Sequence, residues 1–341
     1  MTVPWPVPVS NRAFLAPMSG VSDLPFRRLA AGFGAGLVFS EMVASDRLVA
    51  GEEEARLKLE ADGLAVRAVQ LAGCTEHPLT EAARIAEAAG ADLIDINMGC
   101  PAKRVVHGWA GSALMRDLDH ATRLVRAVVA AVRVPVSLKM RLGWDETSVN
   151  APELARRAEA EGVRMVTVHG RTRRQFYKGT ADWAAIAAVK AAVSVPVVAN
   201  GDCASAADAG EMLARSGADA VMIGRAAVGR PWLVGAVGSA LAGGAPAAAA
   251  EPDPARLAGI VAGHYEAVLG HYGVAAGVRQ ARKHLAGYCD DAMRRCAPAG
   301  AAADHVRCLK AALLTADRPD RVMALLPAFF ASCTETMRQA A

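Results

Sequence analysis

Short apolar runs alternate with longer, Ala-rich amphipathic segments over about the first 240 residues of the chain. This alternation is typical of repeated strand and helix units that form a parallel sheet. Eight such runs favour a closed barrel over an open sheet. The predicted fold is therefore α/β, a (β/α)8 TIM barrel, with strands in runs 14–16, 37–40, 65–70, 93–96, 136–139, 165–168, 195–199 and 220–223.

Each apolar run ends in, or just before, a small or chemically useful residue. Loops are polar in general, so any single position of this kind carries little weight. The carboxyl ends of barrel strands, however, all open on one mouth, where barrel active sites lie. The eight positions together predict a site there, formed by Met18, Glu41, Gln70, Asn97, Lys139, His169, Asn200 and Gly224.

A segment rich in Ala, Gly and Pro follows the last unit, and its composition opposes regular structure. We place a domain boundary here, with the barrel over 1–241, a linker over 242–254 and a second part over 255–341. Apolar residues recur at helical spacing in this second part, as in Leu257, Val261 and Tyr265. Since no β-rich run appears, we expect a small all-helical C-terminal domain.

Composition agrees with buried parallel strands covered by helices. Of the 341 residues, 53% are hydrophobic and only 5% aromatic, so Ala, Val, Leu and Ile must form most of the core. The formal net charge of +4 is compatible with a polyanionic partner. It is far below that of a purely electrostatic nucleic-acid binder, so charge alone does not identify a partner.

Cysteine usage and the ends of the chain bear on compartment. The seven cysteines contain no C-x-x-C pair and no zinc-like spacing, which predicts a reducing environment and no bound metal. The first residues show no basic segment leading into an apolar one, and no apolar run reaches membrane-spanning length. We expect a cytoplasmic protein without membrane contact, and a monomer.

Cys100 is the main candidate for chemistry, because it lies on the turn that leaves a buried run. It offers a proton donor, a nucleophile, a metal ligand or an inert packed thiol. A thiol is mostly protonated at neutral pH and so can act as an acid. Lys103 and Arg104 would favour the thiolate instead. The sequence shows no activating His-Asp pair, with His107 only a loose candidate, and we therefore favour the acid.

Glycine-bearing turns after the seventh and eighth runs predict a phosphate site. Loops at these positions form the phosphate cradle of many barrels, because glycine lets backbone N–H groups approach the oxygens. Arg225 would add charge-assisted contacts. The alternative is that the glycines only make tight turns. The residues concerned are Asn200, Gly201, Asp202, Gly224 and Arg225.

Beside a phosphate site, Lys139 is well placed to stabilise the negative charge that a reduced flavin carries near N1 and O2. Alone, it would more often be a salt-bridged core residue, since a bare buried ammonium is costly. Gln70 has the donors and acceptors for the flavin's uracil-like edge. The stretch Ala16, Pro17, Met18 is expected to present backbone atoms to the ring.

Two further segments suit a carbonyl-bearing substrate at the same mouth. His169 and Arg171 follow the sixth run and supply a donor and a fixed cation. A core histidine held by one hydrogen bond is an equal alternative for His169. Asn97 offers both a donor and an acceptor, which a uracil edge requires.

Together these motifs closely resemble the tRNA-dihydrouridine synthase family, in order and in spacing, over the whole barrel. The segment 281–284, Ala-Arg-Lys-His, also looks like a basic patch of the bacterial B-type subgroup. The motifs are 16–18 (APM), 96–101 (INMGCP), 139–141 (KMR), 169–172 (HGRT), 199–202 (ANGD) and 223–225 (IGR).

The resemblance implies an FMN enzyme that reduces the C5=C6 bond of a uridine in tRNA, with NADPH as reductant. Hydride would pass from flavin N5 to C6, and Cys100 would protonate C5. Asn97, Lys139 and His169 would hold base and flavin in register. The uridine would have to leave the RNA stack to reach the mouth, and the helical domain would hold the RNA backbone.

Other RNA contacts are predicted by charge placement. From residue 251 onward eleven Lys and Arg face nine Asp and Glu, so total charge is small. Arg279, Arg282 and Lys283 fall within about one helical turn and predict a stripe together with Arg307 and Lys310, with a solvated helix face as the alternative. Lys103 and Arg171 are expected beside the substrate. The segment 107–109, His-Gly-Trp, replaces the more polar stretch that the resemblance implies.

Two rival functions stay open. Another flavin barrel could reduce a free pyrimidine or an enone, but it would not need the helical domain. A non-catalytic RNA-binding regulator could keep the barrel but have lost catalysis. Cys100, Lys139 and the predicted phosphate loops argue against it.

Overall fold

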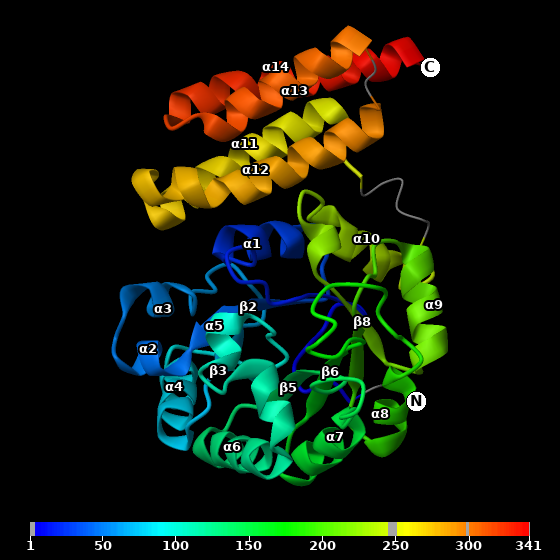
Figure 1. Cartoon of the computed structure of the whole chain (residues 1–341). Helices are drawn as coiled ribbons and strands as arrows, with labels where there is room; N and C mark the ends of the chain where they lie inside the picture. The colour runs from blue at the N-terminus through cyan, green and yellow to red at the C-terminus, as the bar shows by residue number, and fades with distance from the viewer. Residues whose placement is uncertain (1–3, 245–250, 298–299, 341) are drawn as a thin grey trace.

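A computed structural model describes residues 4–244, 251–297 and 300–340. Eight parallel strands form a closed barrel in chain order, and β1 pairs with β8 to close it (Figure 1). The predicted fold class is confirmed. The strands are β1 (Ala13–Leu15), β2 (Leu37–Ala44), β3 (Ala68–Ala72), β4 (Leu93–Met98), β5 (Val136–Arg141), β6 (Met165–His169), β7 (Val197–Asn200) and β8 (Ala220–Ile223).

Helices surround the barrel because their apolar faces cover its buried strands. Several begin where a side chain caps the first free N–H groups, as Asp117 does for His120 N and Ser205 for Asp208 N. The helices of this part are α1 (Leu24–Gly32), α2 (Ser45–Val49), α3 (Glu53–Leu57), α4 (Glu76–Ala88), α5 (Lys103–Val106), α6 (Leu118–Ala131), α7 (Ala151–Ala160), α8 (Ile186–Ala192), α9 (Ala206–Ser216) and α10 (Trp232–Leu241), with 3-10 turns η1 (Gly111–Arg116) and η2 (Arg225–Ala227).

Four of the predicted strand ends are wrong, because β2, β3, β4 and β5 continue two to four residues beyond them. β2 continues to Ala44, so Glu41 lies inside it and is buried, and Gln70 lies in the middle of β3. From sequence alone, a polar residue inside a strand is taken for the end of the strand, because its buried hydrogen-bond partner lies far along the chain. β7 begins at Val197, after Pro196, which has no N–H for the ladder.

The C-terminal part is a helical bundle with a core of its own. It contains α11 (Pro254–Tyr272), α12 (Val274–Cys296), α13 (Gly300–Thr315) and α14 (Pro319–Ala340), packed around Tyr265, Tyr288 and Phe329. Trp232 of α10 also packs in this core. α11 begins one residue before the predicted helical domain, and residues 245–250 of the predicted linker lie outside the described residues. The division into domains stays a prediction.

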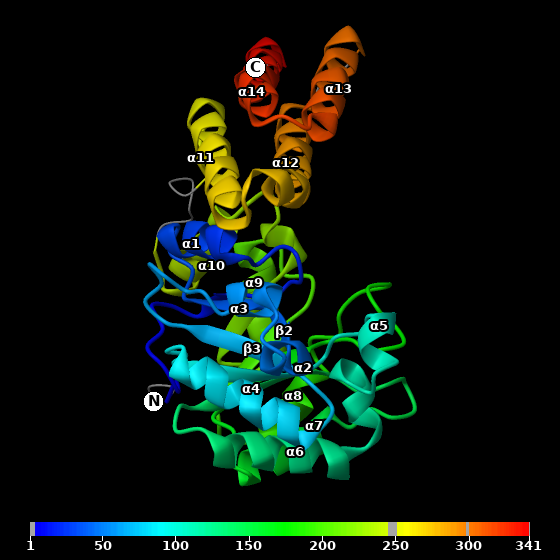
Figure 2. The ribbon, with the colours of Figure 1, turned by 90° about the vertical axis from the view of Figure 1, so that its left-hand side faces the viewer.

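The bundle lies over α1 and α10 at one side of the barrel (Figures 1 and 2). At this contact the Asp23 carboxylate of the α1 cap lies 3.8 Å from His284 Nε2. His264 Nδ1 lies 3.0 Å from the Tyr288 hydroxyl. Burial lowers the pKa of His264 to about 3, so this imidazole is neutral. Within the described residues, we find no helix with the length and hydropathy to span a membrane.

Candidate active site

A layer of polar side chains crosses the barrel interior below its mouth. Gln70 Nε2 donates to Asp95 Oδ2 at 2.7 Å, and Asn97 Nδ2 donates to Gln70 Oε1 at 2.7 Å. Ser137 Oγ donates to Asp95 Oδ1 at 2.6 Å. Burial raises the pKa of Asp95 to about 6, although these hydrogen bonds oppose the shift. The layer fixes Gln70 and Asn97, and sequence reasoning missed Asp95 because its partners lie on neighbouring strands.

Lys139 points into this region from β5. Its Nζ donates to Asn200 Oδ1 at 3.0 Å, and Asn200 Nδ2 donates to the Met222 carbonyl at 2.8 Å. Burial lowers the pKa of Lys139 to about 8, with Asp95 acting in the opposite sense. An ammonium has three donors, so one hydrogen bond leaves capacity for an anionic or carbonyl ligand.

The turn that carries Cys100 is held on both sides. Its backbone N–H donates to Asn97 Oδ1 at 2.9 Å, and its carbonyl accepts from Ser112 Oγ at 2.9 Å. Gly111 has φ +60°, and a Cβ there would lie 2.8 Å from the Cys100 carbonyl oxygen. Only glycine fits this close approach. Asn97 is therefore tied to the position of the thiol as well as to the interior layer.

Arg141 connects the loop after β4 to the loop after β6, a role that sequence reasoning missed. Its Nε donates to the Gly99 carbonyl at 2.8 Å, and its Nη1 donates to the carbonyls of Thr172 and Phe176, each at 2.8 Å. Burial lowers its pKa to about 10, so the guanidinium stays charged at neutral pH. Arg141 thus fixes both loops that flank the thiol.

His169 ends β6 and is surrounded by cations. Burial, followed by the charges of Arg141 and Lys139, lowers its pKa well below the ordinary value of 6.5. Arg171 Nη1 lies 3.3 Å from His169 Nε2, and a guanidinium can only donate. The imidazole is therefore neutral at physiological pH, with its proton on Nδ1 when this bond is made.

Arg171 uses all of its donors inside the protein. Nη1 bonds His169 and Asp202 Oδ1, Nη2 bonds Asp202 Oδ2 at 2.5 Å and the Gly179 carbonyl at 2.7 Å, and Nε bonds the Lys178 carbonyl. A guanidinium has five N–H groups, and these contacts occupy all five. This geometry leaves Arg171 no donor for the substrate contact that the sequence predicts. It also links Asp202 to His169 through Arg171.

Residues predicted to hold a flavin converge from the loops after β1, β7 and β8. A Cβ at Gly224 would lie 3.6 Å from Met18 Sδ and 3.7 Å from Ala16 Cβ, so these loops are in contact. Gly201 has φ +122°, and a Cβ there would lie 3.0 Å from His169 Cδ2. Arg225 keeps 59% of its side chain exposed while pairing with Asp202. Small residues, backbone and an exposed guanidinium suit a phosphate group.

The other predicted substrate contacts lie apart from this cluster. Lys103 is exposed on α5, beyond Cys100, whereas Arg279, Arg282 and Lys283 are exposed on α12 of the bundle. Lys283 Nζ donates to the Gly20 carbonyl at 3.0 Å, on the loop after β1. In the described residues neither Arg279 nor Arg282 enters an ion pair. The structure therefore assigns Lys283 a partner within the chain.

A second titratable cluster lies at the contact between barrel and bundle. Asp23, His264 and His284 place potential ligand atoms within 4.8 Å of one another, and all three are buried. The Asp23 carboxylate also accepts from Phe26 N at 3.0 Å and interacts with the charge of Arg27. This neighbouring guanidinium already compensates the carboxylate. That the chain binds no metal stays a prediction.

Comparison with known proteins settles the family. A model described as "Dihydrouridine synthase (Dus)" matches residues 14–313, most of the chain. The chain belongs to the dihydrouridine synthase family. The resemblance predicted from the motifs is confirmed, and with it the class of protein, an oxidoreductase enzyme.

Relatives within the dihydrouridine synthase family match along nearly their whole length. A "Probable tRNA-dihydrouridine synthase" of Rhizobium leguminosarum bv. phaseoli is 55% identical over 93% of this chain and 95% of its own. One of the same description from Rhodobacter capsulatus is 52% identical, covering 93% and 94%. "tRNA-dihydrouridine synthase B" of Xanthomonas campestris pv. campestris is 49% identical, covering 84% and 86%.

Proposed function

We propose that this protein is an FMN-dependent tRNA-dihydrouridine synthase that reduces the C5=C6 bond of a uridine in tRNA, with NADPH as reductant. The observation that carries this proposal is the fixed position of Cys100 at a barrel mouth lined by Lys139, Asn97 and a neutral His169. Family membership supports the flavin and the tRNA substrate, and NADPH is our proposal for the reductant.

The residues at the mouth fit a flavin mononucleotide. Gly201, Gly224 and Arg225 would hold the phosphate, and Ala16, Pro17 and Met18 would lie along the ring. Lys139 keeps donors free for the N1 and O2 edge, where negative charge gathers on reduction. When bound and reduced, the flavin supplies the hydride for uridine C6.

Cys100 would supply the proton for C5. The backbone contacts of its turn with Asn97 and Ser112 hold the sulfur at the mouth. Lys139 and Arg141 interact electrostatically with the thiol, so they would stabilise the thiolate that is left after proton transfer. A proton from solvent must then restore the thiol before the next turnover.

The substrate base would be held by neutral donors and by shape. His169 is uncharged, so it can donate a hydrogen bond to a uracil carbonyl without placing a second cation beside Lys139. Asn97 would face the base edge with the amide hydrogen that Gln70 does not use. Since a stacked uridine cannot enter the barrel mouth, it must be extruded from the RNA. Lys103, exposed on α5, would contact the neighbouring phosphate.

The test is mass spectrometry of nucleosides from unmodified tRNA after incubation with flavin-loaded protein and NADPH, with a readout of position. A gain of about two mass units on a uridine, absent with free uridine at equal concentration, is the expected result. Equal reduction of free uridine or uracil would favour a small-molecule reductase. A flavin that is not oxidised by tRNA, while other acceptors oxidise it, would overturn the proposal.

A further inference from the structure

Three loops at the rim of the barrel mouth carry an alternating stack of aromatic rings and guanidinium groups, which we call the rim ladder: Trp109, Arg116, Trp144 and Arg173. Arg116 Cζ lies 5.0 Å from the centroid of Trp109 and 4.9 Å from that of Trp144. Arg173 Cζ lies 4.7 Å from the Trp144 centroid. The members come from the loops after β4, β5 and β6, so only the folded barrel assembles the ladder.

The outer end of the rim ladder is exposed and held in an unfavourable backbone conformation. Trp109 is 57% exposed and has φ +58°. Phe176, on the loop after β6, is 43% exposed and has φ +55°. Large non-glycine residues rarely adopt this region, and such strain gathers at functional sites. Trp109 contacts Arg116, and the ring centroid of Phe176 lies 4.7 Å from that of Tyr177, yet both residues stay exposed at a strained backbone position.

The arginines of the ladder are not neutralised. Among the described residues no carboxylate forms a salt bridge with Arg116 or Arg173, whereas the adjacent Arg174 interacts with the charge of Asp145. The nearby acids have other partners, because Asp117 caps α6 and Asp119 pairs with Arg157 at 2.6 Å. The ladder therefore presents ring faces together with free positive charge.

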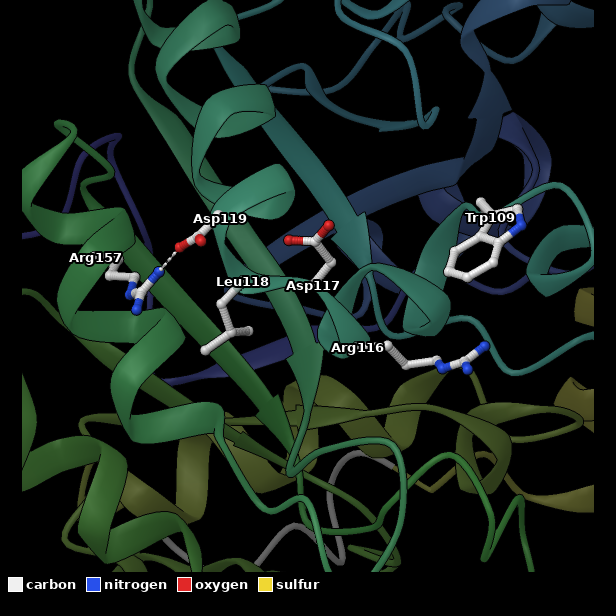
Figure 3. Close-up of a pocket in the computed structure, with 6 residues that line it drawn as sticks. All are labelled: Trp109, Arg116, Asp117, Leu118, Asp119 and Arg157. Carbon is white, nitrogen blue, oxygen red and sulfur yellow. Dashed lines mark hydrogen bonds and ion pairs between the residues drawn. The ribbon is translucent and has the colours of Figure 1, made fainter.

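An open hollow lies beside the outer end of the ladder (Figure 3). Its volume of about 570 Å³ falls within the usual range of ligand sites, roughly 300–1,000 Å³. Figure 3 shows Trp109 and Arg116 on one side of it and the ion pair of Asp119 with Arg157 on the other. The lining residues are Trp109, Arg116, Asp117, Leu118, Asp119 and Arg157.

We propose that the rim ladder stacks an unpaired nucleotide of the RNA substrate, next to the uridine that enters the mouth. Aromatic faces and guanidinium planes are the groups on which proteins stack unpaired bases, and free arginines attract the adjacent phosphates. Gly111 packs on the Cys100 carbonyl, so the segment that carries Trp109 is anchored at the reacting thiol. The inference rests on the proposed function and assigns a role to the segment 107–109.

The experiment measures the Kd of an unmodified tRNA transcript, by fluorescence anisotropy, for full-length flavin-loaded protein. Trp109→Ala is expected to raise Kd about 10-fold, and Trp109→Phe is expected to restore most of the loss. Arg116→Gln should raise Kd and lower the dependence on salt by about one phosphate contact. Val49→Ala, an exposed apolar side chain on α2, is the matched control and should leave Kd unchanged.

Stacking itself has a direct readout. Once the modified uridine is mapped, 2-aminopurine is placed at each neighbouring position in turn. Quenching at one position with the wild type, lost in Trp109→Ala, supports the proposal. Unchanged Kd and unchanged KM for tRNA in both Trp109→Ala and Arg116→Gln, with wild-type flavin content, would overturn it. A wild type that makes no dihydrouridine refutes the proposed function instead, so the two failures are separable.

Discussion

The arginines at the rim of the barrel mouth and the cations on α13 of the helical bundle differ in their partners. In the bundle Arg307 pairs with Asp304, and Lys310 pairs with Asp290. At the mouth Arg116 and Arg173 form no salt bridge with a carboxylate among the described residues. An ion-paired cation contributes little to binding a polyanion, because the pair must first be broken. The comparison indicates that Arg307 and Lys310 contribute less to RNA binding than the arginines of the mouth, whereas Arg279 and Arg282, which enter no ion pair among the described residues, stay candidates on the bundle.

The largest effect should come from removing the proton donor at the mouth. We expect Cys100→Ala to keep the flavin and to lower single-turnover reduction of tRNA by about 100-fold or more, as for loss of a positioned acid. The measurement is stopped-flow absorbance of the flavin on mixing with tRNA. Cys100→Ser places a weaker acid at the same site, so its single-turnover rate should lie between those of the wild type and Cys100→Ala. A wild-type rate in Cys100→Ala would remove this residue from the mechanism.

Removing the free cations next to the mouth should have the second largest effect. The double variant Arg116→Gln with Arg173→Gln is expected to raise the Kd for tRNA about 10-fold to 100-fold and to lower its salt slope by about two. The matched control is Arg307→Gln with Lys310→Gln in the bundle, which should change Kd less than about twofold. Equal effects of the two pairs would abolish the contrast between the regions.

The charge of Lys139 should make FMN binding at the mouth depend on pH. Its ammonium has a pKa lowered to about 8, so the charge is present below that pH and is lost as the pH rises through it. We expect the Kd for FMN to rise above pH 8 in the wild type. Lys139→Met should raise Kd about 10-fold at pH 7 and remove this dependence, in line with loss of a charged hydrogen bond. Equilibrium dialysis at pH 7 and pH 9 gives both values, and parallel profiles would contradict this role.

The bundle contact should show the smallest effect, and it concerns stability. The folded pKa of His264 is about 3, below the unfolded value of about 6.5, so the unfolded state binds the proton first. Stability is therefore lost as the pH falls below about 6.5, by about 2 kcal/mol between pH 7 and pH 5.

Urea unfolding at the two pH values tests this dependence. His264→Phe should lose less stability than the wild type between pH 7 and pH 5, whatever its absolute stability. His305→Gln, at an exposed histidine of α13, is the control and should behave as the wild type. An equal loss in His264→Phe would show that other groups dominate.

The regular part of the fold follows from the sequence, since eight apolar runs predict eight strands. The interior polar layer does not, because Asp95 meets Gln70 and Ser137 only through the register of β3, β4 and β5. Asp95 lies in an apolar run, and the sequence alone does not reveal that its side chain is buried. The glycine turns after β7 and β8 are accessible to sequence reasoning because turn chemistry is local, and their phosphate role stays a prediction.

Interactions between distant loops were beyond sequence reasoning. The rim ladder joins residues from three loops. In the sequence, the segment 107–109 is only a departure from the pattern that the family resemblance implies. Arg171 was assigned to the substrate because an arginine after a strand reads as a free cation. Its five internal hydrogen bonds depend on loop conformations that no residue pattern specifies.

The hydrogen bond from Lys283 Nζ to the Gly20 carbonyl links two distant positions of the chain, which bears on how they evolve. It joins the bundle to the loop that follows β1, whose first residues, Ala16 to Met18, are expected to line the flavin. The bundle therefore contacts a loop of the predicted flavin site directly. After an exchange of C-terminal bundles between relatives, this contact should form when the new bundle carries a lysine at position 283 and the loop keeps glycine at position 20, because a Cβ there would meet the lysine Nζ. The two positions are thus expected to vary together, although 263 residues separate them.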